Sequence, residues 1–176
     1  ASMAMELFSM NHWESFFDSE EELSRAKEHQ LERTITIFPW IAIIDKFQHW
    51  VYENPTYTVE ERTEKWMEIL QEFSTNAIDF TGLETYRAIG WQRQLHLFEV
   101  PFYYIEYGIA QLGAIGLWMQ YKQNPQQAIE NYIKALSLGG TKTLPELYGA
   151  AGLKFDLSPA HIKTLMDFVN EQMENL

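Results

Sequence analysis

Apolar residues recur every three or four positions along nearly the whole chain, and this spacing restricts the fold more than any other feature. In residues 3–17, for example, Met3, Leu7, Met10 and Phe17 would share one side of a helix. No convincing run of the sequence shows the period of two that a half-buried strand requires. The sequence therefore predicts an all-α fold, a multi-helix bundle in which residues 1–176 form a single helical subdomain.

Capping patterns place the first helices. Ser19 stands before three glutamates, and Thr58 opens a Thr-Val-Glu-Glu sequence that matches a capping box. Pro39 is expected to bend or restart the helix that begins near Ser19, because proline removes one backbone donor. The stretch punctuated by Gly82 and Gly90 fits no single element.

Prolines and glycines place the later helices. Pro101 is expected in the first turn of a helix from about Phe102 to Tyr121. Further helix starts are predicted at Pro125, Pro145 and Ser158-Pro159, and helix ends at Gly139-Gly140 and Gly152.

The charge balance argues against several classes of partner. Lys and Arg number 13 and Asp and Glu 25, which gives a net charge of −12, whereas nucleic acid and anionic lipid attract clustered cations. No apolar run approaches the roughly 20 residues that span a bilayer, and the N-terminus lacks the pattern of a signal peptide. We therefore expect no nucleic-acid or membrane partner and a cytoplasmic location, which the absence of cysteine also fits.

Residues 124–136 resemble half of a tetratricopeptide repeat. Such repeats recur at about 34 residues and need about three copies to bury their apolar faces. Positions 34 residues on either side of Ala128 lie in unrelated contexts, so an ordinary amphipathic helix is favoured. A non-enzymatic helical peptide-binding or scaffold module nevertheless stays open as an alternative function.

The histidines do not form a metal site by their spacing. The five are His12, His29, His49, His96 and His161, and no two are four residues apart. The sequence contains no His-Glu-x-x-His, which would place two zinc ligands on one helical face. We therefore predict no metal ligand in this chain.

Residues 91–108 carry the densest unusual chemistry. If a helix begins near Pro101, Tyr103, Tyr104 and Tyr107 gather along one side of it, and His96 can fold back beside its first turn. A histidine and two phenols offer neutral donors to a carbonyl oxygen that is becoming an oxyanion. Alternatively, the tyrosines bury their rings and satisfy their hydroxyls structurally.

Gly108, Gly113 and Gly116 lie inside the same expected helix. Glycine in a helix interior costs about 1 kcal/mol relative to alanine. Close packing of another segment against these glycines is therefore the favoured interpretation.

Several segments, taken in order, resemble the oligoendopeptidase F branch of the thimet oligopeptidase family, a group of zinc peptidases with an HExxH motif. They are Ala1 to Leu7, Phe38 to Ala42 with Asp45 to Tyr52, His96 to Gly108, and Leu138 to Thr141 with Leu144 to Leu147. The resemblance runs over nearly the whole chain. It implies the C-terminal part of a larger helical zincin-type catalytic domain.

The resemblance also implies roles for the aromatic segment. His96, Tyr104 and Tyr107 match positions that contact the substrate or the tetrahedral intermediate, and they are the expected catalytic residues. Tyr103 is expected to bind substrate, and a register shifted by one would exchange it with Tyr104.

Three residues outside that segment receive roles by the same resemblance. Gly139 and Gly140 match a turn near bound peptide, although a helix C-cap explains both glycines equally well. Glu6 matches a glutamate just past the third zinc ligand and is expected to support the metal site without binding the metal. A surface carboxylate is the alternative for Glu6, and His49 is expected to be a structural packing residue.

The implied activity is that of a zinc metalloendopeptidase acting on short peptides. In the family, zinc is held by the two HExxH histidines and by a glutamate that would lie two residues before Ala1. The resemblance therefore implies zinc in the complete enzyme and an N-terminal half of the same enzyme as the packing partner. The isolated chain is expected to be inactive, and to self-associate through the apolar face that this half would cover.

Overall fold

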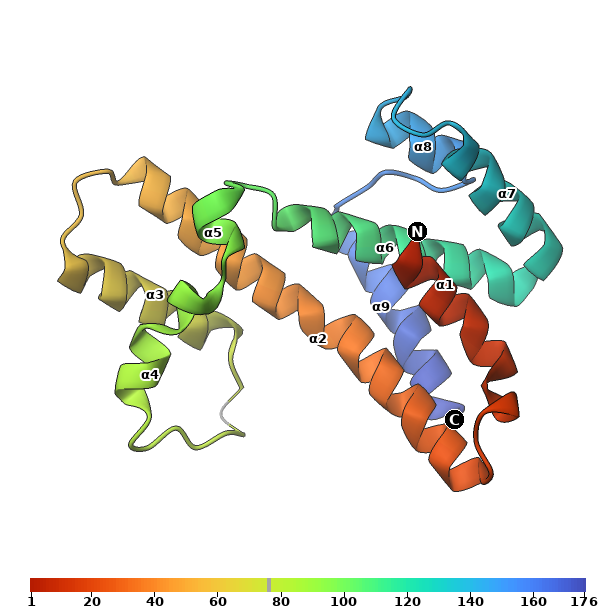
Figure 1. The fold of residues 1–176 in the computed structure, drawn as a ribbon, viewed down its shortest axis with the longest axis horizontal. Helices are drawn as coiled ribbons and strands as arrows, with labels where there is room; N and C mark the ends of the chain where they lie inside the picture. Colours follow the sequence, from red (N-terminus) through yellow and green to blue (C-terminus); the bar gives the residue numbers. More distant parts are fainter. Residues whose placement is uncertain (76) are drawn as a thin grey trace. The chain divides into compact units, whose positions relative to one another are not determined.

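The computed structural model describes residues 1–75 and 77–176, and within them every regular element is helical, which confirms the all-α prediction. Figure 1 shows their order along the chain. The α-helices are α1 (Ser2–Ser9), α2 (Glu20–Glu53), α3 (Val59–Phe73), α4 (Glu84–Ala88), α5 (His96–Glu99), α6 (Ile105–Gln123), α7 (Pro125–Ser137), α8 (Leu144–Ala150) and α9 (Pro159–Glu174). Two 3₁₀ turns, Met10–Ser15 and Gly90–Arg93, extend α1 and precede α5.

Capping residues begin the helices where the sequence predicts them. Thr58 and Glu61 form a reciprocal capping box, in which the Glu61 amide donates to Thr58 Oγ1 at 3.2 Å and the Thr58 amide donates to Glu61 Oε2 at 2.7 Å. Ser158 accepts a hydrogen bond from the His161 amide at the start of α9. These local bonds satisfy amides that have no partner inside the helix.

The helix does not restart at Pro39, because α2 is one helix of 34 residues that contains it, and the alternative that Pro39 bends the helix stays a prediction. Proline inside a helix costs about 3 kcal/mol. Pro39 lies exposed, while Ile41, Ile44 and Phe47 just beyond it are almost completely buried. Burial of these side chains on a continuous helix offsets the lost hydrogen bond.

The predicted helix start at Phe102 is also wrong, because α6 begins at Ile105. Phe102 has a φ of 60°, which lies outside the right-handed helical region. Its amide donates a hydrogen bond of 2.9 Å to Oε1 of the buried Gln48. The chain thus makes a tight turn after Pro101, fixed by a residue distant in sequence that no local pattern could indicate.

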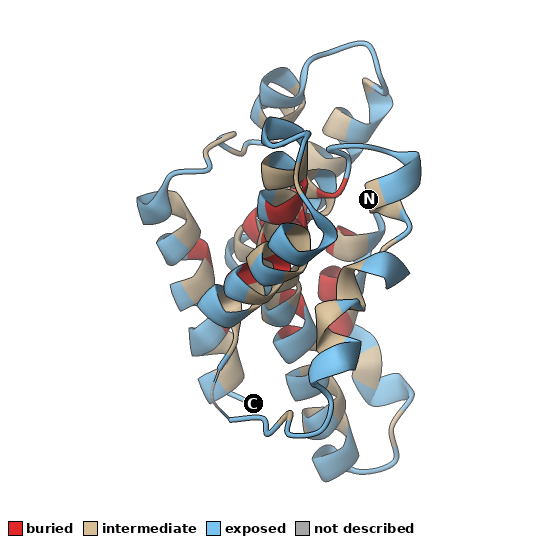
Figure 2. Cartoon of the chain, turned by 90° about the vertical axis from the view of Figure 1, so that its left-hand side faces the viewer, coloured by how far each residue is buried: buried red, intermediate tan, exposed pale blue. Residues whose placement is uncertain are grey.

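The chain divides into two compact units. Unit 1 comprises residues 1–35 and 109–176, and unit 2 comprises residues 36–108. The prediction of one helical subdomain over the whole chain stays a prediction. Figure 2 shows buried and exposed residues alternating along the same helices, as amphipathic helices require.

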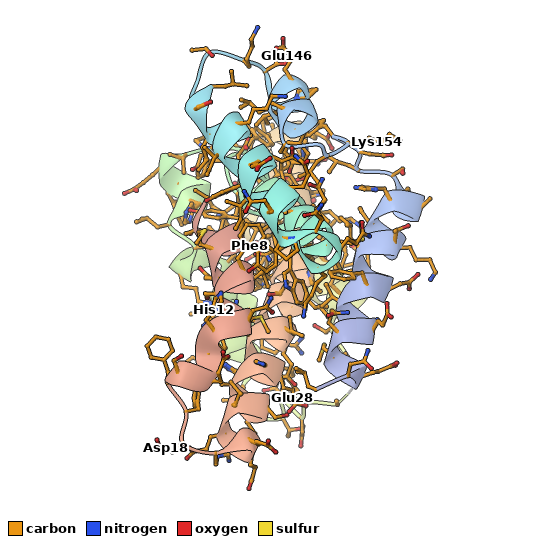
Figure 3. All side chains as sticks on the ribbon, turned by 90° about the vertical axis from the view of Figure 1, so that its right-hand side faces the viewer. Phe8, His12, Asp18, Glu28, Glu146 and Lys154 are labelled. Atoms are coloured by element: carbon orange, nitrogen blue, oxygen red, sulfur yellow. The ribbon has the colours of Figure 1, made fainter. Side chains whose placement is uncertain are left out.

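Each unit has its own apolar core. In unit 1, Phe8 stacks on Tyr121 with ring centroids 4.7 Å apart, and Figure 3 shows it among the side chains of this unit. The core of unit 2 includes Phe47 and Trp66, whose ring centroids lie 5.0 Å apart, together with the buried Tyr104. Because Tyr104 belongs to this core, the aromatic segment singled out in the sequence is held by unit 2 itself.

Candidate functional site

The structure brings His96 and the three neighbouring tyrosines into one cluster in unit 2. The ring centroid of His96 lies 5.0 Å from that of Tyr104, 5.5 Å from that of Tyr107 and 6.3 Å from that of Tyr103. The Tyr107 ring contacts the rings of Tyr103 and Tyr104 edge to face, at 5.8 and 5.2 Å. We call these four residues the His96 cluster.

The cluster forms by a different route from the one the sequence suggests. Tyr103 and Tyr104 do not lie on a helix with Tyr107, because they belong to the turn that precedes α6. The turn at Phe102 brings this segment back toward His96 in the short helix α5. The predicted proximity is therefore present, but a turn produces it rather than helical spacing.

Polar contacts link the cluster to α2. His96 Nε2 lies 3.1 Å from the hydroxyl oxygen of Tyr107, and His96 Nδ1 lies 2.7 Å from Nε2 of Gln94. The indole N–H of Trp40 donates to Oε1 of Gln94 at 3.2 Å. Both imidazole nitrogens thus have hydrogen-bonding partners, and such partners fix the ring orientation.

The phenols of the cluster differ in their surroundings. The Tyr104 side chain is 9% exposed and that of Tyr103 is 48% exposed. Burial raises the pKa of Tyr104 above the ordinary value, the Trp40 indole opposes this change, and the nearby Tyr107 adds to it. Tyr104 therefore stays a neutral hydrogen-bond donor at neutral pH, while the ring of Tyr103 is accessible to a ligand.

The remaining predicted site residues belong to unit 1. Glu6 is exposed on α1, and its Oε2 accepts a hydrogen bond from Gln30 at 3.2 Å. Gly139 has a φ of 53° and follows the end of α7, so the helix terminus accounts for this glycine. Gly140 has open space around its Cα and no positive φ. Roles for Glu6, Gly139 and Gly140 stay predictions.

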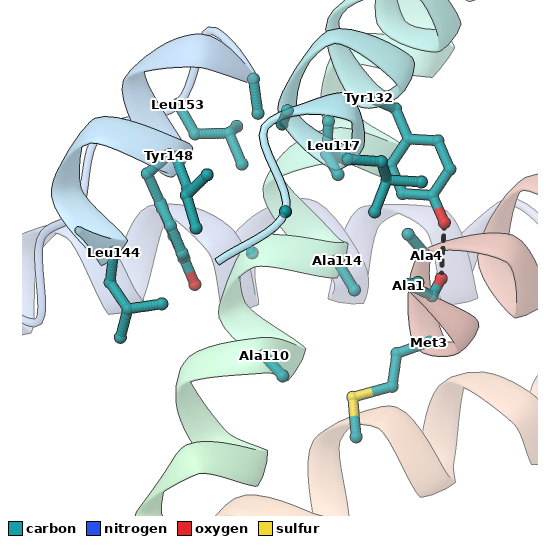
Figure 4. A pocket seen from close by; sticks show the side chains of 16 residues that line it. Ala1, Met3, Ala4, Ala110, Ala114, Leu117, Tyr132, Leu144, Tyr148 and Leu153 are labelled. Atoms are coloured by element: carbon teal, nitrogen blue, oxygen red, sulfur yellow. Dashed lines mark hydrogen bonds between the residues drawn. The ribbon is translucent and has the colours of Figure 1, made fainter. Parts of the chain in front are cut away.

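Unit 1 also contains an apolar pocket of about 270 Å³. Figure 4 shows Met3, Leu144 and Tyr148 around it, and Gly139 contributes to its lining. At one side of the pocket, the Tyr132 hydroxyl donates a hydrogen bond of 3.0 Å to the Ala1 carbonyl. The Gly139 turn thus borders this pocket.

Two predictions about the histidines and metal ligands can be compared with the structure. The His49 side chain is 55% exposed, its Nε2 lies 3.6 Å from Oδ2 of Asp45, and its ring centroid lies 4.9 Å from that of Phe102, so its structural role stays a prediction. Within residues 1–75 and 77–176, no three His, Cys, Asp or Glu side chains are grouped so that they could hold a metal ion.

Sequence reasoning missed Gln94 and Trp40. Gln94 lies two residues before His96, and Trp40 lies 54 residues before Gln94 along the chain. Gln94 is part of no recognisable motif, and a tryptophan in an apolar segment, such as Trp40, is usually interpreted as a core residue. Only the packing of α2 against residues 91–97 reveals their contact with the cluster.

The comparisons with known proteins place the chain in a family. A model of peptidase family M3 matches residues 1–167. The chain belongs to peptidase family M3. In addition, an oligoendopeptidase F homolog of Borreliella burgdorferi is 26% identical to this M3 chain over 117 residues, which cover 64% of the chain and 19% of that protein.

Solved structures of similar proteins agree with this family assignment. One, provisionally described as an oligoendopeptidase F, is 30% identical with a TM-score of 0.84, and Pz peptidase A with an inhibitor is 29% identical with the same TM-score. A third structure, from Bacillus anthracis, is 28% identical with a TM-score of 0.75. Each comparison covers 99% of this chain but only 28 to 31% of the other, so the chain spans less than a third of these structures.

Proposed function

We propose that this chain forms part of a zinc metalloendopeptidase that hydrolyses short peptides, in which it provides a wall of the substrate cleft and donors for the oxyanion. The observation that carries the proposal is the His96–Tyr107 hydrogen bond within a ring of phenols. Membership of peptidase family M3 supports peptide hydrolysis as the reaction.

The cluster has the chemistry for this role. Peptide hydrolysis passes through a tetrahedral intermediate whose oxygen carries negative charge, and preorganised neutral donors stabilise that charge. Tyr107 has an O–H group that its contact with His96 holds in place, and Tyr104 offers a phenol that burial keeps neutral. Tyr103, with its exposed ring, would contact the peptide substrate.

The residues described in this chain do not fit a zinc site, because no suitable group of ligands occurs among them. We therefore assign the zinc ligands to another part of a longer peptidase, and derive no step through the metal. Glu6, Gly139 and Gly140 would act near that part, and the chain by itself would be inactive.

None of the helices in the described residues is long and apolar enough to cross a membrane.

Kinetics of the complete peptidase test the proposal. Tyr107→Phe removes an oxyanion donor and His96→Gln removes the ring that holds this donor in place, so each should lower kcat by on the order of 10²-fold, about the worth of one such donor. KM should change little, since these donors act in the transition state. Tyr86→Phe is the matched control, because Tyr86 is 72% exposed and lies outside the cluster. Unchanged kcat in both cluster variants would instead support a peptide-binding or scaffold module.

A further inference from the structure

We propose that Gln94 and Trp40 are positioning residues that hold neutral His96 in the tautomer with its proton on Nε2. In that tautomer the Tyr107 hydroxyl proton is left available to a substrate oxygen. Neither Gln94 nor Trp40 needs to touch the substrate. The catalytic consequence rests on the proposed function, whereas the tautomer itself rests on the geometry alone.

The orientation of the Gln94 amide follows from its contact with Trp40. An indole nitrogen can only donate a hydrogen bond. Because Trp40 Nε1 lies 3.2 Å from the Gln94 side chain, the atom facing it must be the oxygen Oε1. A reversed amide would bring N–H against N–H. The amide nitrogen of Gln94 is therefore turned toward His96.

The amide orientation in turn fixes the imidazole. Nε2 of Gln94 can only donate, and it lies 2.7 Å from Nδ1 of His96. Nδ1 must therefore accept, which places the single proton of the neutral ring on Nε2. That Nε2–H donates to the hydroxyl oxygen of Tyr107 across 3.1 Å.

The direction of this last bond decides what Tyr107 can do. When its oxygen accepts from His96, its own O–H is free to donate elsewhere. Among the described residues, no other hydrogen-bond partner of the Tyr107 hydroxyl is found. With the proton on Nδ1 instead, Nε2 would accept from Tyr107 and turn the phenol proton inward, away from any substrate.

Packing holds the first member of this chain of donors in place. The Trp40 ring contacts Trp66 edge to face, with centroids 6.1 Å apart. The guanidinium carbon of Arg93 lies over the Trp40 ring at 5.1 Å from its centre. Trp40 belongs to the long helix α2, so the indole N–H is aimed by a rigid element rather than by a loop.

Nuclear magnetic resonance of ¹⁵N-histidine-labelled protein tests the tautomer directly, under alkaline conditions in which histidines are neutral. The His96 signals are assigned by their loss in His96→Gln. The wild-type protein should carry the His96 proton on Nε2. Gln94→Glu should move the proton to Nδ1, because a carboxylate can only accept. Gln92→Glu is the control, since it makes the same charge change on an exposed side chain two residues away.

Trp40→Phe keeps the aromatic packing but removes the indole N–H, so the amide can turn and both tautomers should be populated. This variant tests the inference even if Gln94→Glu fails to fold. A wild-type His96 with its proton on Nδ1, or with an even mixture of tautomers, overturns the inference whatever the kinetics show. If the Trp40→Phe protein still shows only the Nε2–H form, Trp40 is not needed to hold the tautomer, and its role as a positioning residue fails.

Kinetics of the complete peptidase separate this inference from the proposed function. Gln94→Glu should lower kcat by on the order of 10²-fold with little change in KM, as loss of one oxyanion donor does. Gln92→Glu should leave both unchanged. If Gln94→Glu moves the proton to Nδ1 and kcat does not fall, the tautomer assignment stands and the donor role proposed for Tyr107 fails.

Discussion

Tyr103 and Tyr104 are neighbours in the sequence, yet the first is 48% exposed and the second 9%. The turn at Phe102 places one ring outward and the other in the core of unit 2. Sequence spacing could indicate that the phenols gather near His96, but it could not indicate which of them is buried and which is exposed. That division depends on contacts between segments far apart in the sequence, such as Gln48 with Phe102.

The buried phenol has a consequence for stability at alkaline pH. Burial raises the pKa of Tyr104 in the folded state, so the folded protein holds this proton more tightly than the unfolded chain. The stability from this neutral phenol is complete below the unfolded pKa of about 10 and is lost as the pH rises toward the folded value.

Tyr104→Phe should therefore lessen the loss of unfolding free energy at alkaline pH. Chemical denaturation of both proteins across neutral and alkaline pH measures it, and the difference between them cancels the other tyrosines. An equally steep alkaline decline in both proteins would contradict the raised pKa.

At the scale of the helices, most starts could be predicted because their signals are local. Thr58 with Glu61, and Ser158 before Pro159, cap helices by contacts within one turn. The start of α6 could not be predicted, because the buried Gln48 overrides the helical preference that follows Pro101. The predicted restart at Pro39 failed for a similar reason, because burial of the side chains that follow Pro39 keeps α2 continuous.

The glycines of α6 show that close packing was correctly expected. A Cβ on Gly113 would lie 2.7 Å from the Tyr148 hydroxyl oxygen, and a Cβ on Gly116 would lie 3.0 Å from Leu153. The Tyr148 hydroxyl donates to the Ile109 carbonyl on the same helix, so it cannot move away without losing that bond. These glycines thus let the α8 segment approach α6 closely.

Gly113→Ala should lower the unfolding free energy by about 1–3 kcal/mol, as overpacking typically does. Gly149→Ala is the matched control, because a Cβ on Gly149 in α8 meets nothing within 4 Å. That change should be neutral or stabilise by up to about 1 kcal/mol through helix propensity. Urea denaturation measures both variants, and equal effects would show that Tyr148 does not restrict this position.

At the scale of the whole molecule, the family could be predicted from ordered local segments, and the match over residues 1–167 confirms it. The metal chemistry could not be located, since the described residues lack a suitable group of ligands. Large apolar side chains are nevertheless exposed, including Met5, Ile133, Leu136 and Leu144 in unit 1. We propose that the rest of a longer peptidase covers such residues, and that without it the chain self-associates.

The central claim is that the His96 cluster stabilises the tetrahedral intermediate. The most direct test measures how tightly the complete peptidase binds a peptide phosphinate, a tetrahedral anion, and the corresponding product peptide. Tyr107→Phe should weaken phosphinate binding by the same factor as it lowers kcat/KM, on the order of 10²-fold, and leave product binding nearly unchanged. Equal weakening of both ligands, or unchanged phosphinate binding, would contradict the claim.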